Sequence, residues 1–565
     1  MDGGALTRMH LDTPPQPLAA RERLLVLALS LGVALTRWVA VARTLWDWDE
    51  ALFVVAMRDF DVSAYHPHPP GFPLFIALAK LVPLGAFHAL QCVAVLASLL
   101  LFPAAFFLAR ELRLPTFVCI ASALLLAFSP NVWLFGGTAF SDIPSLVLSL
   151  VACALLLRGC RSDRALLLGC VALGVAAGIR PQNLLIAAAP LLLAFLHRRR
   201  TAVLGALITA TMVMVSYGIA AELSGGIDRY RATLASHARY IRSVDSFRAP
   251  LRPSLLRVAD DFFVRPFRAP AINLALTLLA LAGLMRRRAW LAAAIFGPFL
   301  LFAWLTLDFH STSRFSIAYM PLFAIFAAEG LDLFRRARTF ALAAVLALLI
   351  VWTLPALLVV HRTAAPPAAA AQWIRAHAGA QQAVLFVDPR LGAHAAALLG
   401  DYTRIETTGA PAVMHARATA FVLRESSGAL QFVRTRERLE GLTRPRYFEV
   451  SIERAPHIVF GDGWYGEEGP PHAPFRWMAR SARALLPVTR TPRRLTLRAQ
   501  APSDTTVEVR IDGRLLERFA THRGFFERQW TIGSERELTI VTSASSRAPG
   551  DARELGLRVE WLLVE

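Results

Sequence analysis

Long apolar runs recur through the first 360 residues of the chain, and they constrain its fold more than any other feature. Each run is long enough, or nearly so, to cross a hydrocarbon core of about 30 Å as a helix. The runs also explain why 55% of the residues are hydrophobic and only 18% are charged, which is unusual for a soluble protein. We expect spans at residues 23–42, 87–109, 114–130, 142–157, 164–180, 182–196, 202–222, 271–285, 289–307, 315–333 and 339–360. The sequence therefore predicts a polytopic α-helical membrane protein with about eleven transmembrane helices.

Arginine sets the expected orientation of these helices. The formal net charge of +19 comes from basic residues scattered through the turns, so it does not indicate a nucleic-acid-binding protein. Arginine-rich turns concentrate on the cytoplasmic side of a membrane. We therefore expect residues 1–22 inside and the residues after 360 outside. The turns that carry this prediction contain Arg21, Arg23, Arg110, Arg113, Arg158, Arg161, Arg164, Arg198, Arg199, Arg200, Arg286, Arg287, Arg288, Arg335, Arg336 and Arg338.

The apolar stretch 72–84 is short for a span, and a crossing there would invert the charge pattern downstream. We expect a re-entrant or interfacial helix that starts after Pro69-Pro70-Gly71 on the outer face. The membrane domain 23–360 then has two outer loops, 43–86 and 223–270. The second loop is rich in arginine. It fits either an amphipathic helix on anionic headgroups or a basic lid over a phosphate-bearing lipid.

Residues 361–565 are expected to form a soluble region outside the membrane. Ala364 to Ala371 is rich in Ala and Pro and indicates a linker. Helical and strand-like segments predict a small α/β region over 361–450. Short strands with period-two alternation then predict a β-sandwich over 451–565.

Aromatic side chains in this tail have two interpretations. Trp464, Tyr465 and Trp477 either form a platform for a sugar or pack in the core and at strand edges. All five cysteines lie in or beside the apolar runs, so no disulfide framework is expected in the tail.

An acidic segment, Trp46-Asp47-Trp48-Asp49-Glu50, follows the first apolar run, where the chain leaves the bilayer. Carboxylates at this depth are expensive, which makes them functional candidates. Paired carboxylates suit a general base, a metal ligand or a proton relay. The flanking tryptophans are typical interfacial anchors and place the acids at the depth of lipid phosphates. We therefore expect Asp49 and Glu50 to be catalytic residues.

A further acid, Asp142, opens a span at its outer end in Phe140-Ser141-Asp142-Ile143-Pro144. One interpretation is that it caps the helix that follows. The other is that it converges with Asp49 on one pocket as a catalytic residue. The same two carboxylates are the candidate ligands if the site holds a divalent metal ion.

Isolated basic residues stand at the outer ends of other spans. Arg180 and Arg314 suit stabilisation of a phosphate leaving group by charge-assisted hydrogen bonds, and snorkelling to headgroups is the alternative. His66 and His68 suit metal binding or a hydrogen bond to a phosphate. Because prolines flank them, a turn-forming role is the alternative.

Taken in order, these pieces resemble the GT-C glycosyltransferases, especially the branch with bacterial aminoarabinose transferases and protein O-mannosyltransferases. The resemblance covers about residues 20–360. The pieces are the Asp49-Glu50 pair, His68-Pro69-Pro70-Gly71 before a short helix, Ser141-Asp142-Ile143-Pro144, and Arg314 before Tyr319-Met320-Pro321.

The resemblance implies transfer of a hexosyl or pentosyl group, with inversion, from a polyprenyl-phosphate donor to an extracytoplasmic glycan, lipid or protein. It implies Asp49 as the base, Asp142 as the residue that orients the acceptor or a metal, and Arg314 with Arg180 on the phosphate. The expected location is the bacterial inner membrane. The alternatives are a non-catalytic lipid-glycan transporter or flippase, and an assembly protein whose tail binds cell-wall sugars.

Overall fold

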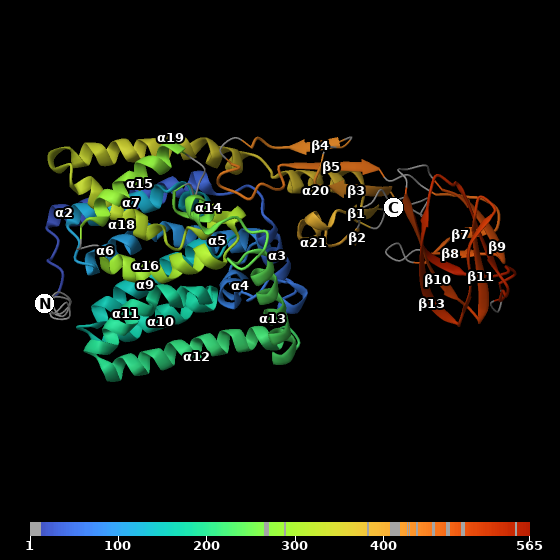
Figure 1. The fold of residues 1–565 in the computed structure, drawn as a ribbon, viewed down its shortest axis with the longest axis horizontal. Coiled ribbons are helices and arrows are strands. Elements are labelled where there is room, and N and C mark those ends of the chain that lie inside the picture. The colour runs from blue at the N-terminus through green and yellow to red at the C-terminus, as the bar shows by residue number, and fades with distance from the viewer. Residues whose placement is uncertain are drawn as a thin grey trace. The chain divides into compact units, whose positions relative to one another are not determined.

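Helices fill the first part of the chain and strands fill most of the last part (Figure 1). The computed structural model divides the chain into two units. One contains Met1–Ala365 with Thr435–Arg446, and the other contains Pro366–Arg434 with Tyr447–Glu565. The residues that it does not describe are 1–12, 265–269, 287–289, 381–382, 407–418, 427, 429, 437–438, 455–457, 470–474, 487–491, 548–550 and 565. The arginines at positions 265, 268, 287 and 288, part of the predicted basic turns and loop, therefore lie outside the described residues.

The first unit is a bundle of helices. Every predicted span coincides with a helix or with a bent pair of helices. These are α2 (Ala20–Thr36) with η1 (Arg37–Ala40), α5 (Ala86–Leu99) with α6 (Leu101–Glu111), α7 (Thr116–Phe128), α9 (Asp142–Gly159), α10 (Asp163–Ile179), α11 (Leu184–His197), α12 (Arg199–Leu223), α15 (Pro270–Leu284), α16 (Trp290–Thr306), α18 (Met320–Asp332) and α19 (Arg338–Arg362).

Length and composition identify fewer of these helices as membrane spans. Among the described residues, four helical segments are long and apolar enough to cross a membrane, or six if each of two bent pairs counts as one span. The bent pairs are α5 with α6, at 43°, and Phe309–Phe315 with α18, at 66°. The positions of the predicted helices are thus observed, and the number of crossings stays a prediction.

The arginine-rich turns meet one another through ion pairs. Arg161 pairs with Glu111, which joins the turn after α9 to the end of α6. Arg198 lies 2.8 Å from Asp163, so the turn before α12 joins the same group. Asp332 pairs with both Arg286 and Arg338, which joins two later turns. These contacts agree with turns that share one face of the bundle.

The outer loops contain helices. Loop 43–86 holds α3 (Trp48–Ala56), η2 (Val62–Ala64) and α4 (Pro73–Lys80), the short helix predicted after Gly71. Loop 223–270 holds α13 (Ile227–Val244), α14 (Leu255–Ala259) and the π-helix η4 (Asp260–Val264).

Side-chain contacts join the two loops. The Tyr230 hydroxyl of α13 donates a 2.7 Å hydrogen bond to the Pro70 carbonyl oxygen, and Arg229 pairs with Asp61. Helix α13, green in Figure 1, accordingly packs against η2 of the first loop.

The second unit begins with a helix where the sequence predicted a linker. Helix α20 (Pro366–His377) covers most of the Ala/Pro-rich stretch, so that prediction is wrong. Proline is well suited to the first turn of a helix, where its missing N–H is not needed, and alanine has the highest helix propensity.

Helices α20 and α21 (Gly392–Leu398) belong to a unit with a mixed sheet. Its strand order is β2-β1-β3-β5-β4, with β1 parallel to both neighbours. The strands are β1 (Ala383–Val387), β2 (Thr403–Glu406), β3 (Thr419–Arg424), β4 (Leu430–Val433) and β5 (Glu449–Arg454).

The rest of the chain is β-rich, with two five-stranded antiparallel sheets ordered β13-β10-β15-β8-β7 and β12-β11-β14-β9-β6. Buried residues of both sheets, such as Leu497 of β10 and Val509 of β11, form one hydrophobic core. Trp464 packs against this core, which agrees with the packing interpretation of that side chain. The strands are β6 (Val459–Phe460), β7 (Trp464–Glu468), β8 (Phe475–Met478), β9 (Ser481–Leu485), β10 (Arg493–Ala501), β11 (Thr505–Ile511), β12 (Arg514–Thr521), β13 (Gly524–Ile532), β14 (Glu537–Thr542) and β15 (Arg558–Val564).

Candidate active site

Two of the three acids in the acidic segment hold the start of α3. Asp47 is the N-cap residue, and its Oδ1 accepts a 3.0 Å hydrogen bond from the Asp49 N–H. Glu50 accepts from the N–H groups of Trp46 and Asp47 on Oε2, at 2.7 and 2.9 Å, and from that of Ala139 on Oε1, at 2.9 Å. This is a capping box extended by a third bond to the turn before α9. Glu50, which the sequence predicted to be catalytic, is therefore engaged entirely by backbone groups.

Asp49 instead turns its carboxylate toward side chains. It is only 7% exposed and pairs with Arg314 through Oδ2. Arg444 approaches the same oxygen with Nη2 at 3.4 Å, and His68 Nδ1 lies 3.8 Å from Oδ1. Asp49 is thus the acid of this segment whose carboxylate faces the interior of a side-chain cluster.

Arg314 joins Asp49 to Asp142. Its Nε lies 3.0 Å from Asp142 Oδ2, while its Nη1 bonds to Asp49. Arg180 completes the group, with Nη1 at 2.8 Å from Asp142 Oδ1 and Nε donating to Ser141 Oγ at 3.0 Å. The structure therefore brings together four of the predicted site residues. It also gives the Asp142 carboxylate two arginine partners, a role that capping alone does not include.

The turn Asn131 to Asp142 fixes the position of Arg314. Asn131 donates from Nδ2 to the Ser313 carbonyl oxygen at 2.8 Å and to Ser316 Oγ at 2.9 Å. The Phe140 ring lies beneath the guanidinium of Arg314, with its centroid 4.2 Å from Cζ. A short helix, α17 (Thr312–Phe315), carries Arg314. Arg314 is thereby positioned by hydrogen bonds to the residues on either side of it and by the Phe140 ring.

Of the two predicted histidines, only one lies in the cluster. His68 reaches the cluster and lies between the rings of Phe53 and Phe72, at 5.7 and 4.8 Å between centroids. His66 instead pairs with Asp59 at 3.2 Å, where the carboxyl side chain is 70% exposed. The structure places His66 outside the cluster, in the loop that leads to it.

Burial and charge set opposite protonation tendencies in neighbouring groups. Burial raises the pKa of Asp49, but the positive charges of Arg444 and Arg314 outweigh it and hold the pKa well below its usual range. Burial lowers the pKa of His68 to about 4, so its imidazole is neutral near pH 7. Burial raises the pKa of Glu50 to about 7, against three backbone hydrogen bonds that favour the carboxylate.

Two site residues were missed from the sequence. Arg444 comes from the segment between β4 and β5 and donates from Nε to Ser311 Oγ at 2.9 Å. His237 of α13 lies near enough to Asp49 for that charge to act on its pKa, which burial lowers. Neither belongs to a motif, and a single arginine in an arginine-rich protein gives no signal of its own.

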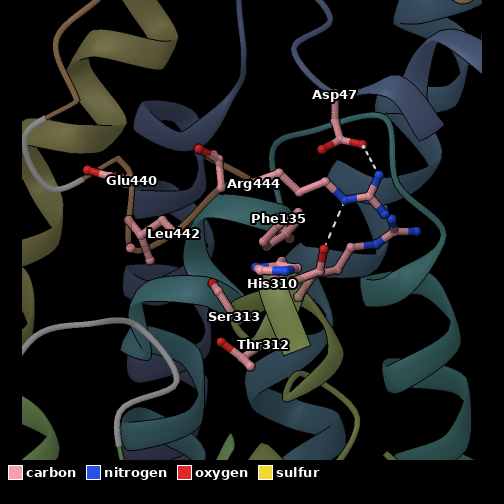
Figure 2. Close-up of a pocket in the computed structure, with 12 residues that line it drawn as sticks. Asp47, Phe135, His310, Thr312, Ser313, Glu440, Leu442 and Arg444 are labelled. Carbon is pink, nitrogen blue, oxygen red and sulfur yellow. Dashed lines mark hydrogen bonds and ion pairs between the residues drawn. The ribbon is translucent and has the colours of Figure 1, made fainter. Parts of the chain in front are cut away.

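Arg444 closes a small cavity beside Asp47 (Figure 2). Figure 2 shows its side chain extended toward Asp47, near the Phe135 ring and His310. The lining residues are Asp47, Phe135, His310, Ser311, Thr312, Ser313, Arg314, Glu440, Gly441, Leu442, Thr443 and Arg444. A second cavity lies on the other side of Arg314, lined by Asp142, Arg180, Asn183 and Phe299 among others. Arg314 therefore lines both cavities.

The cluster does not have the donor set of a metal site. Within the described ranges, no three His, Cys, Asp or Glu side chains gather closely enough to hold a metal ion. Asp49 and Asp142, the predicted ligands, are joined by the guanidinium of Arg314, which supplies the positive charge between them. We therefore assign no step to a metal.

No protein-family model and no curated protein matches the chain. Several solved structures are similar to it. ArnT from Cupriavidus metallidurans bound to undecaprenyl phosphate is similar over 77% of this chain and 98% of its own, at 13% identity and a TM-score of 0.46. The arabinofuranosyltransferase AftD from Mycobacteria is similar over 97% of this chain and 59% of its own, at 14% identity and a TM-score of 0.42. For the arabinosyltransferase EmbB from Mycobacterium smegmatis these values are 99%, 67%, 14% and 0.37. At such scores the function has to be argued from the site itself.

Proposed function

We propose that this chain is an integral membrane glycosyltransferase of the GT-C type. It moves a hexosyl or pentosyl group, with inversion, from a polyprenyl-phosphate donor to an extracytoplasmic acceptor. The observation that carries the proposal is the Arg314 bridge between Asp49 and Asp142, which places acids and bases from distant segments in one buried site. The resemblance of the sequence to that family supports it independently.

In the proposed reaction Asp49 is the general base. Its carboxylate takes the proton of an acceptor hydroxyl while that oxygen bonds to the anomeric carbon. The bond from the anomeric carbon to the phosphate oxygen breaks on the opposite face, and its electron pair leaves with the polyprenyl phosphate. Arg314 and Arg180 stabilise the negative charge of the leaving group. Asp142 holds both arginines in place and orients the acceptor.

Neutral His68 suits a hydrogen-bonding role toward the sugar or the phosphate. Its Nδ1 is buried and has no hydrogen-bond partner among the described residues. A buried polar atom of this kind gains most from a ligand that supplies the missing partner.

The same geometry supports a proposal for the location of the site. We propose that the site faces the outside of the bacterial inner membrane, with the β-rich C-terminal region on that side as a β-sandwich appendage. Residues 439–446, which lie beyond the last span in sequence, meet Asp49 through Arg444. The site and this later segment therefore lie on the same side of the bundle.

Replacement of Asp49 by Asn tests the proposal. Loss of a general base lowers a rate by about 10²–10⁴-fold. In a deletion strain that expresses Asp49→Asn, we expect mass spectrometry to detect a polyprenyl-phosphate sugar that accumulates and one envelope glycan modification that is missing. Asp59→Asn is the matched control, because Asp59 is an exposed acid of the same loop. If Asp49→Asn restores the glycan as well as wild type does, Asp49 is not the base and a lipid-glycan transporter becomes the better interpretation.

A further inference from the structure

Arg444 holds its carboxylate partners less closely than the other two arginines of the cluster do, while its Nε donates to Ser311 Oγ at 2.9 Å. Its side chain is 22% exposed, against 13% for Arg180 and 5% for Arg314. Its Nη atoms lie 3.4 Å from Asp49 and 3.9 Å from Asp47, so both ion pairs are loose. The other two arginines each hold a carboxylate at 3.0 Å or closer. An anion that enters the site therefore competes most easily for Arg444.

Formal charge in the cluster is balanced before any ligand binds. Three aspartates face three arginines, and His68 is neutral because burial lowers its pKa. A donor phosphate adds negative charge, and in a buried site such a charge requires a cationic partner. Arg180 and Arg314, the proposed partners of the leaving group, each also hold a buried carboxylate, so the added charge calls for a further cation. When Arg444 moves, Asp49 keeps its ion pair with Arg314, and Asp47 keeps its hydrogen bond from the Asp49 N–H.

The cavity beside Arg444 is small in this state. It measures about 20 Å³, which is room for a single water molecule. A phosphate group fits there only after the guanidinium swings away from the two aspartates. From the same segment, Glu440, Gly441, Leu442 and Thr443 line the cavity beside Arg444.

We propose that Arg444 binds the phosphate group of the lipid-linked donor and is delivered to the site by residues 439–446. This inference rests on the proposed function, because it requires a donor that carries a phosphate. When Arg444 turns to the phosphate, Asp49 loses one cationic partner and becomes a stronger base. Donor binding then activates the base in the same step, and the free enzyme keeps Asp49 poorly reactive.

Binding of two lipids to the purified full-length protein tests the inference. The probes are polyprenyl phosphate and polyprenol of the same chain length, which differ only in the phosphate. We expect Arg444→Ala to weaken polyprenyl phosphate binding about tenfold or more and to leave polyprenol binding unchanged. Arg446→Ala is the matched control, because it removes the same charge from an exposed position two residues further along. We expect it to bind both lipids as wild type does.

Three results would contradict the inference. Equal affinity of wild type and Arg444→Ala for polyprenyl phosphate overturns it and leaves the proposed function standing. Equal weakening of both lipids also overturns it, because the effect is then structural. If wild type binds polyprenyl phosphate no better than polyprenol, the proposed function fails together with the inference. Arg444→Gln removes the charge and keeps a polar side chain, so it carries the test, with the same expected result, if the alanine variant does not fold.

The coupling to Asp49 has a separate kinetic readout. In the free enzyme, loss of a nearby cation favours the protonated acid, so the pKa of Asp49 rises in Arg444→Ala. We expect the acid limb of the pH profile of kcat/KM to move to higher pH in this variant and to stay in place in Arg446→Ala. An unchanged acid limb means that Arg444 does not control the base.

Discussion

Asp47, Asp49 and Glu50 are close neighbours in sequence, yet the helix that they begin divides their work. The carboxylates of Asp47 and Glu50 accept hydrogen bonds from backbone N–H groups at the start of α3. Asp49 lies between them, and the turn of the helix points its carboxylate toward Arg314. A capping box fixes the side chains at the N-cap and N3 positions and leaves the intervening residues free for other contacts. The local fold thus separates Asp49, the proposed base, from the two acids that hold the start of the helix.

Glu50→Gln distinguishes these roles. Three N–H donors converge on the two carboxylate oxygens of Glu50, and an amide places an –NH₂ group against at least one of them. We expect the variant to lose about 1–3 kcal/mol of stability, measured as a lower unfolding temperature in detergent. Its turnover per folded molecule should remain near that of wild type.

Asp49→Asn should instead lose most of its turnover per folded molecule, because it lacks the proposed base. If Glu50→Gln loses turnover to the same degree while keeping its stability, Glu50 acts in the chemistry and the assignment of the base has to change.

At the scale of elements, the turn between α8 (Pro130–Phe135) and α9 connects the acidic segment at the start of α3 to Asp142. It places the Phe140 ring against Arg314, supplies the N–H of Ala139 to Glu50, and leads into Asp142. A glycine in this turn permits its close approach to the bundle. A Cβ on Gly137 would lie 1.9 Å from the Ala40 carbonyl oxygen, which is backbone and cannot move aside.

Gly137→Ala should therefore displace the turn. We expect a loss of about 1–3 kcal/mol in stability from this overpacking and a parallel loss of turnover, because Glu50 and Arg314 both depend on the turn. Thermal unfolding and lipid-linked sugar turnover measure the two effects. Gly218→Ala in α12 is the control, because a Cβ there meets nothing within 4 Å. Equal behaviour of the two variants would show that the close approach at Gly137 is not a constraint.

Sequence periodicity predicted elements well where apolar residues dominate. Each predicted span coincides with helical structure because bilayer-length apolar runs have few other stable forms. It failed at Ala364 to Ala371, where composition indicated a linker although alanine favours a helix. Periodicity also did not predict α3, because the acidic first turn of that helix is typical of a loop.

At the scale of the whole molecule, the sequence predicted only the part of the candidate active site that comes from the ends of apolar runs. Asp49, Asp142, Arg180 and Arg314 stand at the ends of apolar runs, so a two-dimensional topology is enough to place them on one face. Arg444 lies 395 residues from Asp49 in sequence and follows no periodic pattern. Only the three-dimensional path of the chain between β4 and β5 brings it to the acids.

Membrane orientation is the property of the whole molecule on which the proposal depends, and α12 allows a direct test. At about 1.5 Å per residue its 25 residues extend about 37 Å, which exceeds a hydrocarbon core of about 30 Å. Arg200 lies in its first turn and Arg231 lies beyond its end, in α13, and both are exposed. A single spanning helix therefore separates the two positions.

Cysteine labelling in intact cells reads out this separation. The five native cysteines are buried or partly buried, so they contribute little background. We expect Arg231→Cys to react with a membrane-impermeant maleimide from outside and Arg200→Cys to react only after the membrane is permeabilised. The Arg200 side is then the cytoplasmic side, and α13, which fastens to the Asp49 loop at Pro70, is outside. The reverse pattern would place the acidic site in the cytoplasm, where an extracytoplasmic acceptor has no access, and the transfer reaction proposed here would have to be abandoned.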